Sequence, residues 1–197
     1  MLRSRRRFVA SICSVLALGT LLASPRARAE VELGLVGGAS TYASTWRGDY
    51  GAGGTLRGAV RFAHVVAGDF QAWESYATVN HRANTGLSLG ITGYLPLSRV
   101  HPYGRIFAIH QHEEGLVSVA NAPAGTLLGV GAGIRHRAGG GLSLGAEVPL
   151  PPTTRGEQRF KWNLIAEAMG VYFPDPTLGP GGYIGIDLGI GFDYSLR

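Results

Sequence analysis

One short stretch of the chain, residues 110–114, carries the side chains best suited to chemistry. It reads HQHEE, and the alternation of faces along a β-strand would place His110, His112 and Glu114 together. Two imidazoles and a carboxylate suit zinc or a similar divalent ion. These three residues are therefore candidate metal ligands, with another ligand still needed from elsewhere. Three further histidines have no reliable place in the pattern: His81, His101 and His136.

Two serine–histidine pairings, His112 with Ser118 and His81 with Ser88, have the residue types needed for acyl transfer. Neither lies in a recognisable nucleophile motif, and the sequence does not fix the distance within either pair. The Gly-x-Gly runs at 129–131 and 189–191 lie inside alternating stretches and open no helix, so they do not predict a phosphate-binding loop. An enzymatic role stays open, and no cofactor is predicted.

The stretch that defines the fold is residues 181–197. Every second residue from Ile184 to Leu196 is large and apolar, and the residues between them are Gly, Asp or Ser. Strict alternation of this kind predicts a β-strand. Its apolar face would pack on a second sheet in a soluble sandwich, or face lipid in a membrane barrel whose interior takes the Gly and Asp face.

Similar alternation recurs along the rest of the chain. Nine segments are predicted as strands: residues 31–42, 55–66, 70–79, 85–95, 103–112, 126–137, 142–148, 159–173 and 184–196. Most are longer than the ~5–6 residues of an average soluble strand and reach the ~9–11 residues that cross a membrane. Aromatic residues gather near strand ends, as at an interfacial girdle. We expect an all-β fold, a closed antiparallel up-and-down transmembrane β-barrel. Because bacterial barrels have an even number of strands, we expect eight, or ten with an extra strand at 116–120.

One hairpin allows a prediction of register. A two-residue turn at residues 67–68 would set Arg61 opposite Glu74 on a shared polar face. It would also put Trp73 on the apolar face that points away from the interior.

Charged residues alternate with large apolar ones in these segments, so they are predicted to point into the barrel. The lumen ion-pair candidates are Arg57, Arg61, Glu74, Arg135, Glu147, Lys161, Glu167, Asp187 and Asp193. A narrow barrel fills its lumen with side chains, and buried charges must pair. We interpret the set as a structural ion-pair core, with Lys161 the nearest candidate partner for Asp187 and Asp193. A pore lined by these groups is the alternative.

The N-terminus predicts export. Residues 1–29 run from an arginine-rich start through an apolar core to the small-x-small sequence ARA, as in a cleavable signal peptide. Six of the 18 basic residues lie there, so residues 30–197 carry 12 basic and 13 acidic residues and a net charge of −1. This balance does not predict nucleic-acid binding. The sole cysteine, Cys13, also lies in the signal, so the mature domain, residues 30–197, has none.

These features together resemble the small outer-membrane β-barrel proteins of Gram-negative bacteria, the OmpA/OmpX-like class. The resemblance rests on the export signal, on HPYGRIFAI at 101–109 with TLLGVGAGIRHRAGGGLSLGAEV at 126–148, and on the terminal strand. It implies location in the outer membrane, lipid as a partner, and recognition of the last strand by the barrel-assembly machinery. That strand usually ends in an aromatic residue, whereas here Phe192 and Tyr194 precede a terminal Leu196-Arg197.

The sequence thus predicts an integral outer-membrane barrel with a packed polar interior, acting structurally or through surface loops at residues 43–54, 113–125 and 149–158. A lipid-modifying enzyme and a narrow pore are the alternative functions, and a soluble exported β-sandwich is the alternative fold. A polar strand end at the membrane surface would account for the histidines at 110 and 112 without a metal.

Overall fold

The computed structural model describes residues 31–196, with the exception of residues 96, 98, 123, 126, 127, 132 and 152–159. The predicted signal peptide, residues 1–29, and the boundary at residue 30 lie outside the described part.

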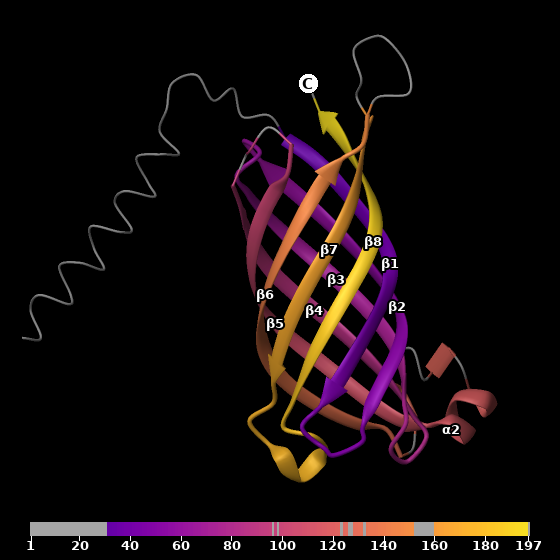
Figure 1. Ribbon diagram of the computed structural model, residues 1–197. Helices are drawn as coiled ribbons and strands as arrows, with labels where there is room; N and C mark the ends of the chain where they lie inside the picture. Colours follow the sequence, from indigo (N-terminus) through magenta and orange to yellow (C-terminus); the bar gives the residue numbers. More distant parts are fainter. Residues whose placement is uncertain are drawn as a thin grey trace, which may run out of the picture.

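The described chain forms one closed barrel of eight antiparallel strands (Figure 1). The strands are β1 Val31–Ser44, β2 Tyr50–Phe62, β3 Val66–Ala77, β4 Arg82–Tyr94, β5 His101–Gly115, β6 Arg135–Pro149, β7 Phe160–Tyr172 and β8 Gly182–Leu196. Each strand pairs with the next along the chain, and β8 closes the sheet by pairing with β1, with Leu35 opposite Phe192. The predicted fold class is therefore confirmed, with eight strands.

Two predicted strands, at residues 126–137 and 116–120, are not found as separate strands among the described residues. Residues 135–149 form a single strand, whereas the glycine-rich stretch before it is a loop in which Gly129 and Gly133 have φ of +69° and +83°. These backbone angles favour glycine, so the regular glycine spacing there reflects turns. Residues 116–121 form the short helix α2, Leu116–Asn121, in place of a strand.

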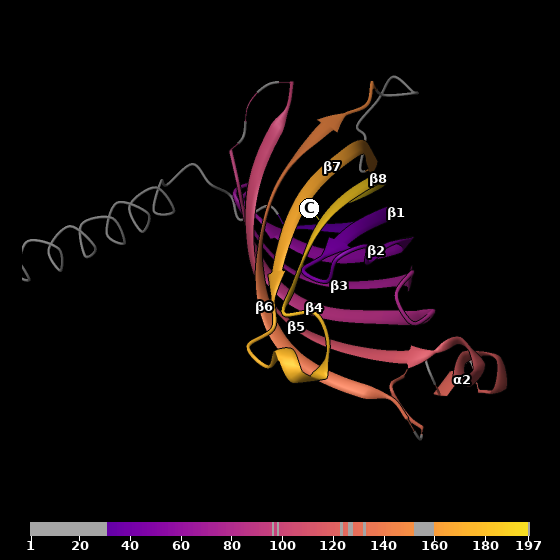
Figure 2. The same cartoon turned by 60° about the horizontal axis from the view of Figure 1, so that its bottom comes forward.

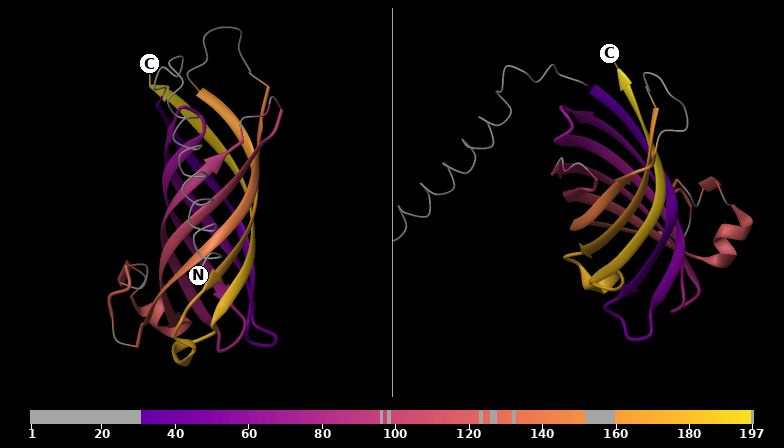
Figure 3. Two further views of the ribbon diagram at one scale, coloured as in Figure 1. Left: turned by 90° about the vertical axis from the view of Figure 1, so that its left-hand side faces the viewer. Right: turned by 45° about the horizontal axis from the view of Figure 1, so that its top comes forward.

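The two ends of the barrel differ. At the terminal end, where β1 begins and β8 ends, the connections follow β2, β4 and β6; at the opposite end, here called the loop end, they follow β1, β3, β5 and β7 (Figures 1 and 2). The longest connection, residues 116–134, contains α2 and projects sideways from the loop end (Figure 3). The predicted surface loops at 43–54 and 113–125 thus map to the loop end, whereas most of the predicted loop at 149–158 lies outside the described residues. The strands that flank it, β6 and β7, end and begin at the terminal end.

The outer wall of the barrel is apolar. Along β8, Ile184, Ile186 and Leu188 are 73%, 55% and 59% exposed, whereas Asp187 and Asp193 between such residues are buried. Comparable exposed apolar side chains occur on the other strands, including Leu89, Ile106, Leu144 and Leu164. At the terminal end, Phe160, Trp162, Phe192 and Tyr194 form a cluster with ring centroids 4.9–6.4 Å apart. None of the helices among the described residues is long and apolar enough to span a membrane.

The predicted register of the β2–β3 hairpin is wrong. The turn is a three-residue connection at residues 63–65, and Arg61 pairs with Ala67. Glu74 pairs with Gly54 instead of Arg61. The change exchanges the two faces of β3, because neighbouring residues of a strand point to opposite sides. As a result Trp73 is buried in the interior, 4% exposed, and Glu74 lies on the outer wall.

The interior holds a layer of aromatic and apolar side chains nearer the loop end. Its buried members are Tyr42, Trp73, Ala77, Phe107, Ile109, Met169, Val171, Phe173 and Tyr183. Inward-facing glycines allow the rings to lie against the barrel wall: a Cβ at Gly86 would collide with the indole of Trp73, and one at Gly141 with the ring of Phe107. Large side chains thus fit in a narrow lumen because the wall residues that they contact are glycines, which have no side chain.

Candidate functional site

The polar interior near the terminal end is organised around Arg61. Its guanidinium lies 2.8 Å from Glu147 and 3.2 Å from Asp193, and its carbon is 4.1 Å from the ring centre of Tyr94. Asn163 donates a hydrogen bond of 2.8 Å to Asp193. The cation therefore joins carboxylates from β6 and β8 to β2 across the lumen.

A second group of ion pairs fills the middle of the lumen. Arg57 lies 3.0 Å from Glu167 and 3.4 Å from Asp69, and Arg105 lies 2.6 Å from the other oxygen of Asp69. The Tyr103 hydroxyl donates to Glu167 at 2.5 Å. All four charged side chains are at most 5% exposed, so each charge is removed from water and neutralised by a partner.

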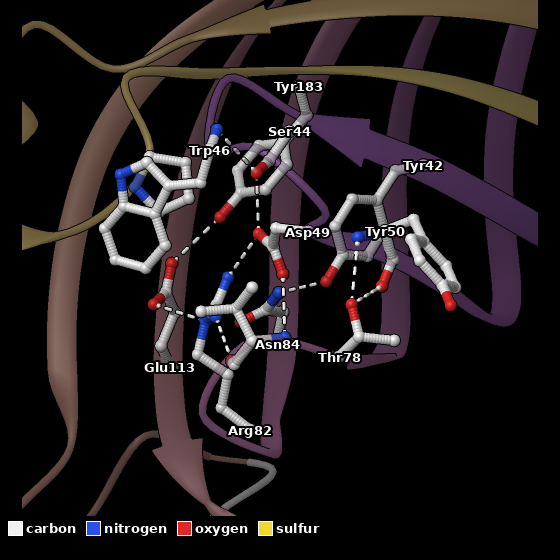
Figure 4. A network of polar contacts seen from close by, with 12 residues as sticks. Tyr42, Ser44, Trp46, Asp49, Tyr50, Thr78, Arg82, Asn84, Glu113 and Tyr183 are labelled. Atoms are coloured by element: carbon white, nitrogen blue, oxygen red, sulfur yellow. Dashed lines mark hydrogen bonds and ion pairs between the residues drawn. The ribbon is translucent and has the colours of Figure 1, made fainter.

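A third group of ion pairs lies at the loop end (Figure 4). Arg82 lies 2.7 Å from Asp49 and 3.1 Å from Glu113, and Glu113 also pairs with Arg137. The Tyr183 hydroxyl donates to Glu113 at 2.9 Å. Figure 4 shows Arg82 between Asp49, on the β1–β2 connection, and Glu113 on β5. This network covers the aromatic layer from the loop side.

Two cavities adjoin these groups in the described part of the chain. One interior cavity, bordered by Arg57, Arg61 and Glu147, has a volume of about 10 Å³, roughly that needed by a single water. A larger hollow of about 450 Å³ is at the terminal end, between Glu32, His64, Lys161 and His101. Both the ion pairs and the aromatic layer lie between this hollow and the loop end.

The nine predicted lumen charges are found at three kinds of location: the interior, the two rims and the outer wall. Six are buried in the interior: Arg57, Arg61, Glu147, Glu167, Asp187 and Asp193. Lys161 and Arg135 lie at opposite rims, with side chains 47% and 42% exposed, paired with Glu32 and Glu113. Glu74 lies on the outer wall, for the reason given by the hairpin register.

Among the described residues, Lys161 does not form the predicted ion pair with either of the two β8 aspartates, Asp187 and Asp193. Lys161 is directly opposite Asp193 in the sheet, but its ammonium group lies 2.7 Å from Glu32. Asp193 pairs with Arg61, and Asp187 accepts a hydrogen bond of 3.0 Å from Gln71.

Several interior charges are not among the sequence candidates: Glu32, Asp49, Asp69, Arg82, Arg105, Glu113 and Arg137. Most of them could have been identified from the alternation of polar and apolar residues, because each lies between outward-facing residues of its strand. Asp49 lies on a connection, where alternation gives no signal.

A separate cluster of titratable residues lies on the outer wall near the loop end. Nitrogen atoms of His110, His112 and His136 all lie within 4.8 Å of one another, and His110 Nε2 is 3.2 Å from His136 Nδ1. His112 and His136 are directly opposite each other on β5 and β6. The structure thus brings two of the predicted metal ligands together with His136, whose position the sequence left open. His81 and His101 lie elsewhere, at the β3–β4 connection and at the start of β5.

Glu114, the third predicted ligand, lies two residues beyond His112 on the same face of β5 and is 2% exposed. It is not part of the three-histidine group. Glu74 interacts with it electrostatically and accepts a hydrogen bond from Thr85. This outer-wall region therefore combines three imidazoles with two carboxylates.

The serine–histidine pair at residues 81 and 88 is not brought together. Ser88 is inside the lumen, where Arg105 donates to its hydroxyl at 2.9 Å, whereas the His81 ring contacts the Tyr76 hydroxyl at the β3–β4 connection. Ser118 is in α2, on the connection that follows His112.

Comparisons with known proteins support the fold. No protein-family model matches the chain, and no curated protein matches its sequence. Among solved structures, the chain is similar to Neisserial surface protein A, with a TM-score of 0.56 at 9% identity, covering 84% of this chain and 97% of that one.

Two structures from Pseudomonas aeruginosa align less closely. They are the N-terminal β-barrel domain of OprF (TM-score 0.48, 16% identity, 86% of this chain and 100% of that one) and the outer membrane protein OprG (TM-score 0.47, 14% identity, 87% and 98%). From its closed eight-stranded sheet and its likeness to the Neisserial protein, this chain has the fold of the small outer-membrane β-barrels.

Proposed function

We propose that this chain is an integral outer-membrane barrel whose interior is closed to ions and whose contacts with other molecules are made at its loop end. The two faces of the sheet carry different kinds of side chain. Large apolar residues cover the outside, and paired charges fill the inside. In water this arrangement would expose a continuous apolar surface, whereas in a bilayer that surface faces lipid.

The closed interior favours a structural or surface-interaction role over transport. Ion pairs of Arg57 and Arg61 lie across the lumen, and the adjoining cavity holds roughly one water. An ion would have to displace these pairs and then pass the aromatic layer. The length of the connection at residues 116–134 supports the loop end as the contact surface, because binding residues concentrate on loops held by a rigid scaffold.

Reconstitution tests both parts of the proposal. The purified domain should enter detergent or lipid and migrate differently on a gel before and after heating. In a planar bilayer it should give no stepwise conductance. Recovery from the aqueous fraction without detergent would contradict the membrane assignment. Reproducible conductance steps from folded, heat-modifiable protein would contradict the closed interior and favour the pore.

A matched variant makes a negative conductance result informative. Replacing Arg57 and Arg105 together by Ala removes two of the cations that fill the middle of the lumen. If this variant folds and conducts while the wild type does not, the side chains themselves close the lumen. Stepwise conductance of equal size in both proteins would contradict the proposed role of the ion pairs.

A further inference from the structure

We propose that His110, His112 and His136 form a binding site for a divalent transition-metal ion such as zinc, on the outer wall of the barrel at its loop end. Their ligand nitrogens lie within 4.8 Å of one another. With a Zn–N distance of about 2.0–2.1 Å, two nitrogens of a tetrahedral site are about 3.3 Å apart. The 3.2 Å between His110 Nε2 and His136 Nδ1 matches that spacing.

The backbone already holds the three side chains in place. His112 and His136 are opposite each other in the hydrogen-bonded ladder of β5 and β6, and His110 is two residues from His112 on the same face. All three ring centroids are 5.3–6.0 Å apart. A metal ion would therefore require only rotations of side chains, with no rearrangement of the strands.

The surrounding charge favours a cation. Glu114 is 2% exposed, and neither of its carboxylate oxygens has a hydrogen-bond partner among the described residues. Glu74 adds a second negative charge close by. A buried carboxylate without a compensating charge is costly, so a bound cation beside it would stabilise this part of the wall.

The connection between β5 and β6 packs over the same histidines. A Cβ placed on Gly129 would lie 2.9 Å from His136 Cε1 and 3.1 Å from His112 Nδ1, and Gly129 has a φ of +69°. Both the backbone angle and the closeness to the rings therefore favour glycine at this position. His110 and His136 remain exposed, so an ion can reach the site from outside.

The donor set indicates which ions would bind. Imidazole nitrogens suit zinc, nickel and copper, whereas magnesium and calcium prefer oxygen ligands. Three protein ligands leave a fourth position for water or another donor, as in three-histidine zinc sites. The alternative is a cluster of imidazoles that bond to each other and bind no metal.

The test is calorimetric titration of zinc chloride into a protein of residues 30–197, folded in detergent and free of any affinity tag. We expect saturable binding of one zinc per chain and no binding of magnesium. His110→Ala and His136→Ala should each lower zinc affinity more than tenfold. His101→Ala is the matched control, because this histidine lies on the same strand at the terminal end, and it should leave the affinity unchanged.

A second measurement separates loss of the site from loss of the fold. Zinc should raise the thermal melting midpoint of the wild type and of His101→Ala, but not that of His136→Ala, while all variants keep heat-modifiable migration. Glu114→Gln should weaken zinc binding several-fold with the stoichiometry unchanged. The proposal is overturned if the wild type shows no saturable zinc binding, or if binding persists unchanged in both His110→Ala and His136→Ala.

Discussion

At the residue scale, Arg61 connects strands that are distant in sequence. Its guanidinium pairs with Glu147 and Asp193 while its side chain is 8% exposed. Arg61→Met would leave both carboxylates buried without their cation. Removing one partner of a buried ion pair costs about 3–5 kcal/mol, and we expect a decrease of this order in the free energy of unfolding, measured by urea titration in lipid vesicles.

Two further variants test whether the loss of stability in Arg61→Met comes from the broken ion pairs. Arg47→Met, on the exposed β1–β2 connection, is the matched control and should change stability by less than about 0.5 kcal/mol. The double variant Arg61→Met with Glu147→Gln should recover part of the loss, since it removes an unpaired charge. Equal stability of Arg61→Met and Arg47→Met would show that the interior ion pairs do not stabilise the barrel.

The inward-facing glycines make a second prediction at this scale. Gly86→Ala would put a Cβ into the indole of Trp73, whereas a Cβ added to Gly93, on the same strand, would meet no heavy atom within 4 Å. Overpacking of this kind costs about 1–3 kcal/mol. Gly86→Ala should therefore lower the urea midpoint, and Gly93→Ala should not. The interpretation fails if the two variants unfold at the same urea concentration.

At the scale of elements, the closing pair β8–β1 decides whether the sheet is a barrel. Leu35 and Phe192 are directly opposite each other in this pair. Opposed antiparallel residues have Cα atoms about 4.5–5.5 Å apart, within the range a disulfide spans. Because the only cysteine is Cys13, residues 30–197 offer a cysteine-free background. Leu35→Cys with Phe192→Cys should form a disulfide on mild oxidation of the folded protein.

The matched control moves one cysteine along the same face. Leu188 is four residues from Phe192, about 13 Å along the strand, so Leu35→Cys with Leu188→Cys should stay reduced. Non-reducing gel migration reports both outcomes. Cross-linking of the control pair, or none in the opposed pair, would contradict the closing register.

The positions of the strands could be predicted from the sequence, but the register between them could not. Alternation is a local property, so it identified β8 and most other strands and assigned Asp187 and Asp193 to the interior. The β2–β3 register depended on whether the turn had two residues or three, which local patterns did not decide, and the faces of Trp73 and Glu74 were exchanged as a result.

The sequence could place two of the three clustered histidines together, but not the third. The positions of His110 and His112 follow from strand spacing, but His136 joins them only because of the β5–β6 pairing. The connection between these strands is long, so its length gave no register. Glycine turns within it also imitated strand alternation.

At the scale of the whole molecule, three layers of side chains account for the proposed behaviour. Apolar residues on the outer wall suit lipid, ion pairs and aromatic rings fill the interior, and the loop end carries the long connection with its adjacent histidines. Each of the three tryptophans of the chain lies in a different one of these environments. Trp46 is on the β1–β2 connection, Trp73 is inside at 4% exposed, and Trp162 is on the outer wall at 50% exposed.

Fluorescence quenching of single-tryptophan variants in lipid bilayers tests whether the outer wall faces lipid while the interior excludes water. Each variant keeps one tryptophan and replaces the other two by Phe. We predict that Trp162 is quenched by brominated phospholipid, that Trp46 is quenched by aqueous acrylamide, and that Trp73 is protected from both. If acrylamide quenches Trp73 as strongly as Trp46, the interior is open to water. If Trp162 responds to acrylamide and not to brominated lipid, the outer wall does not face lipid.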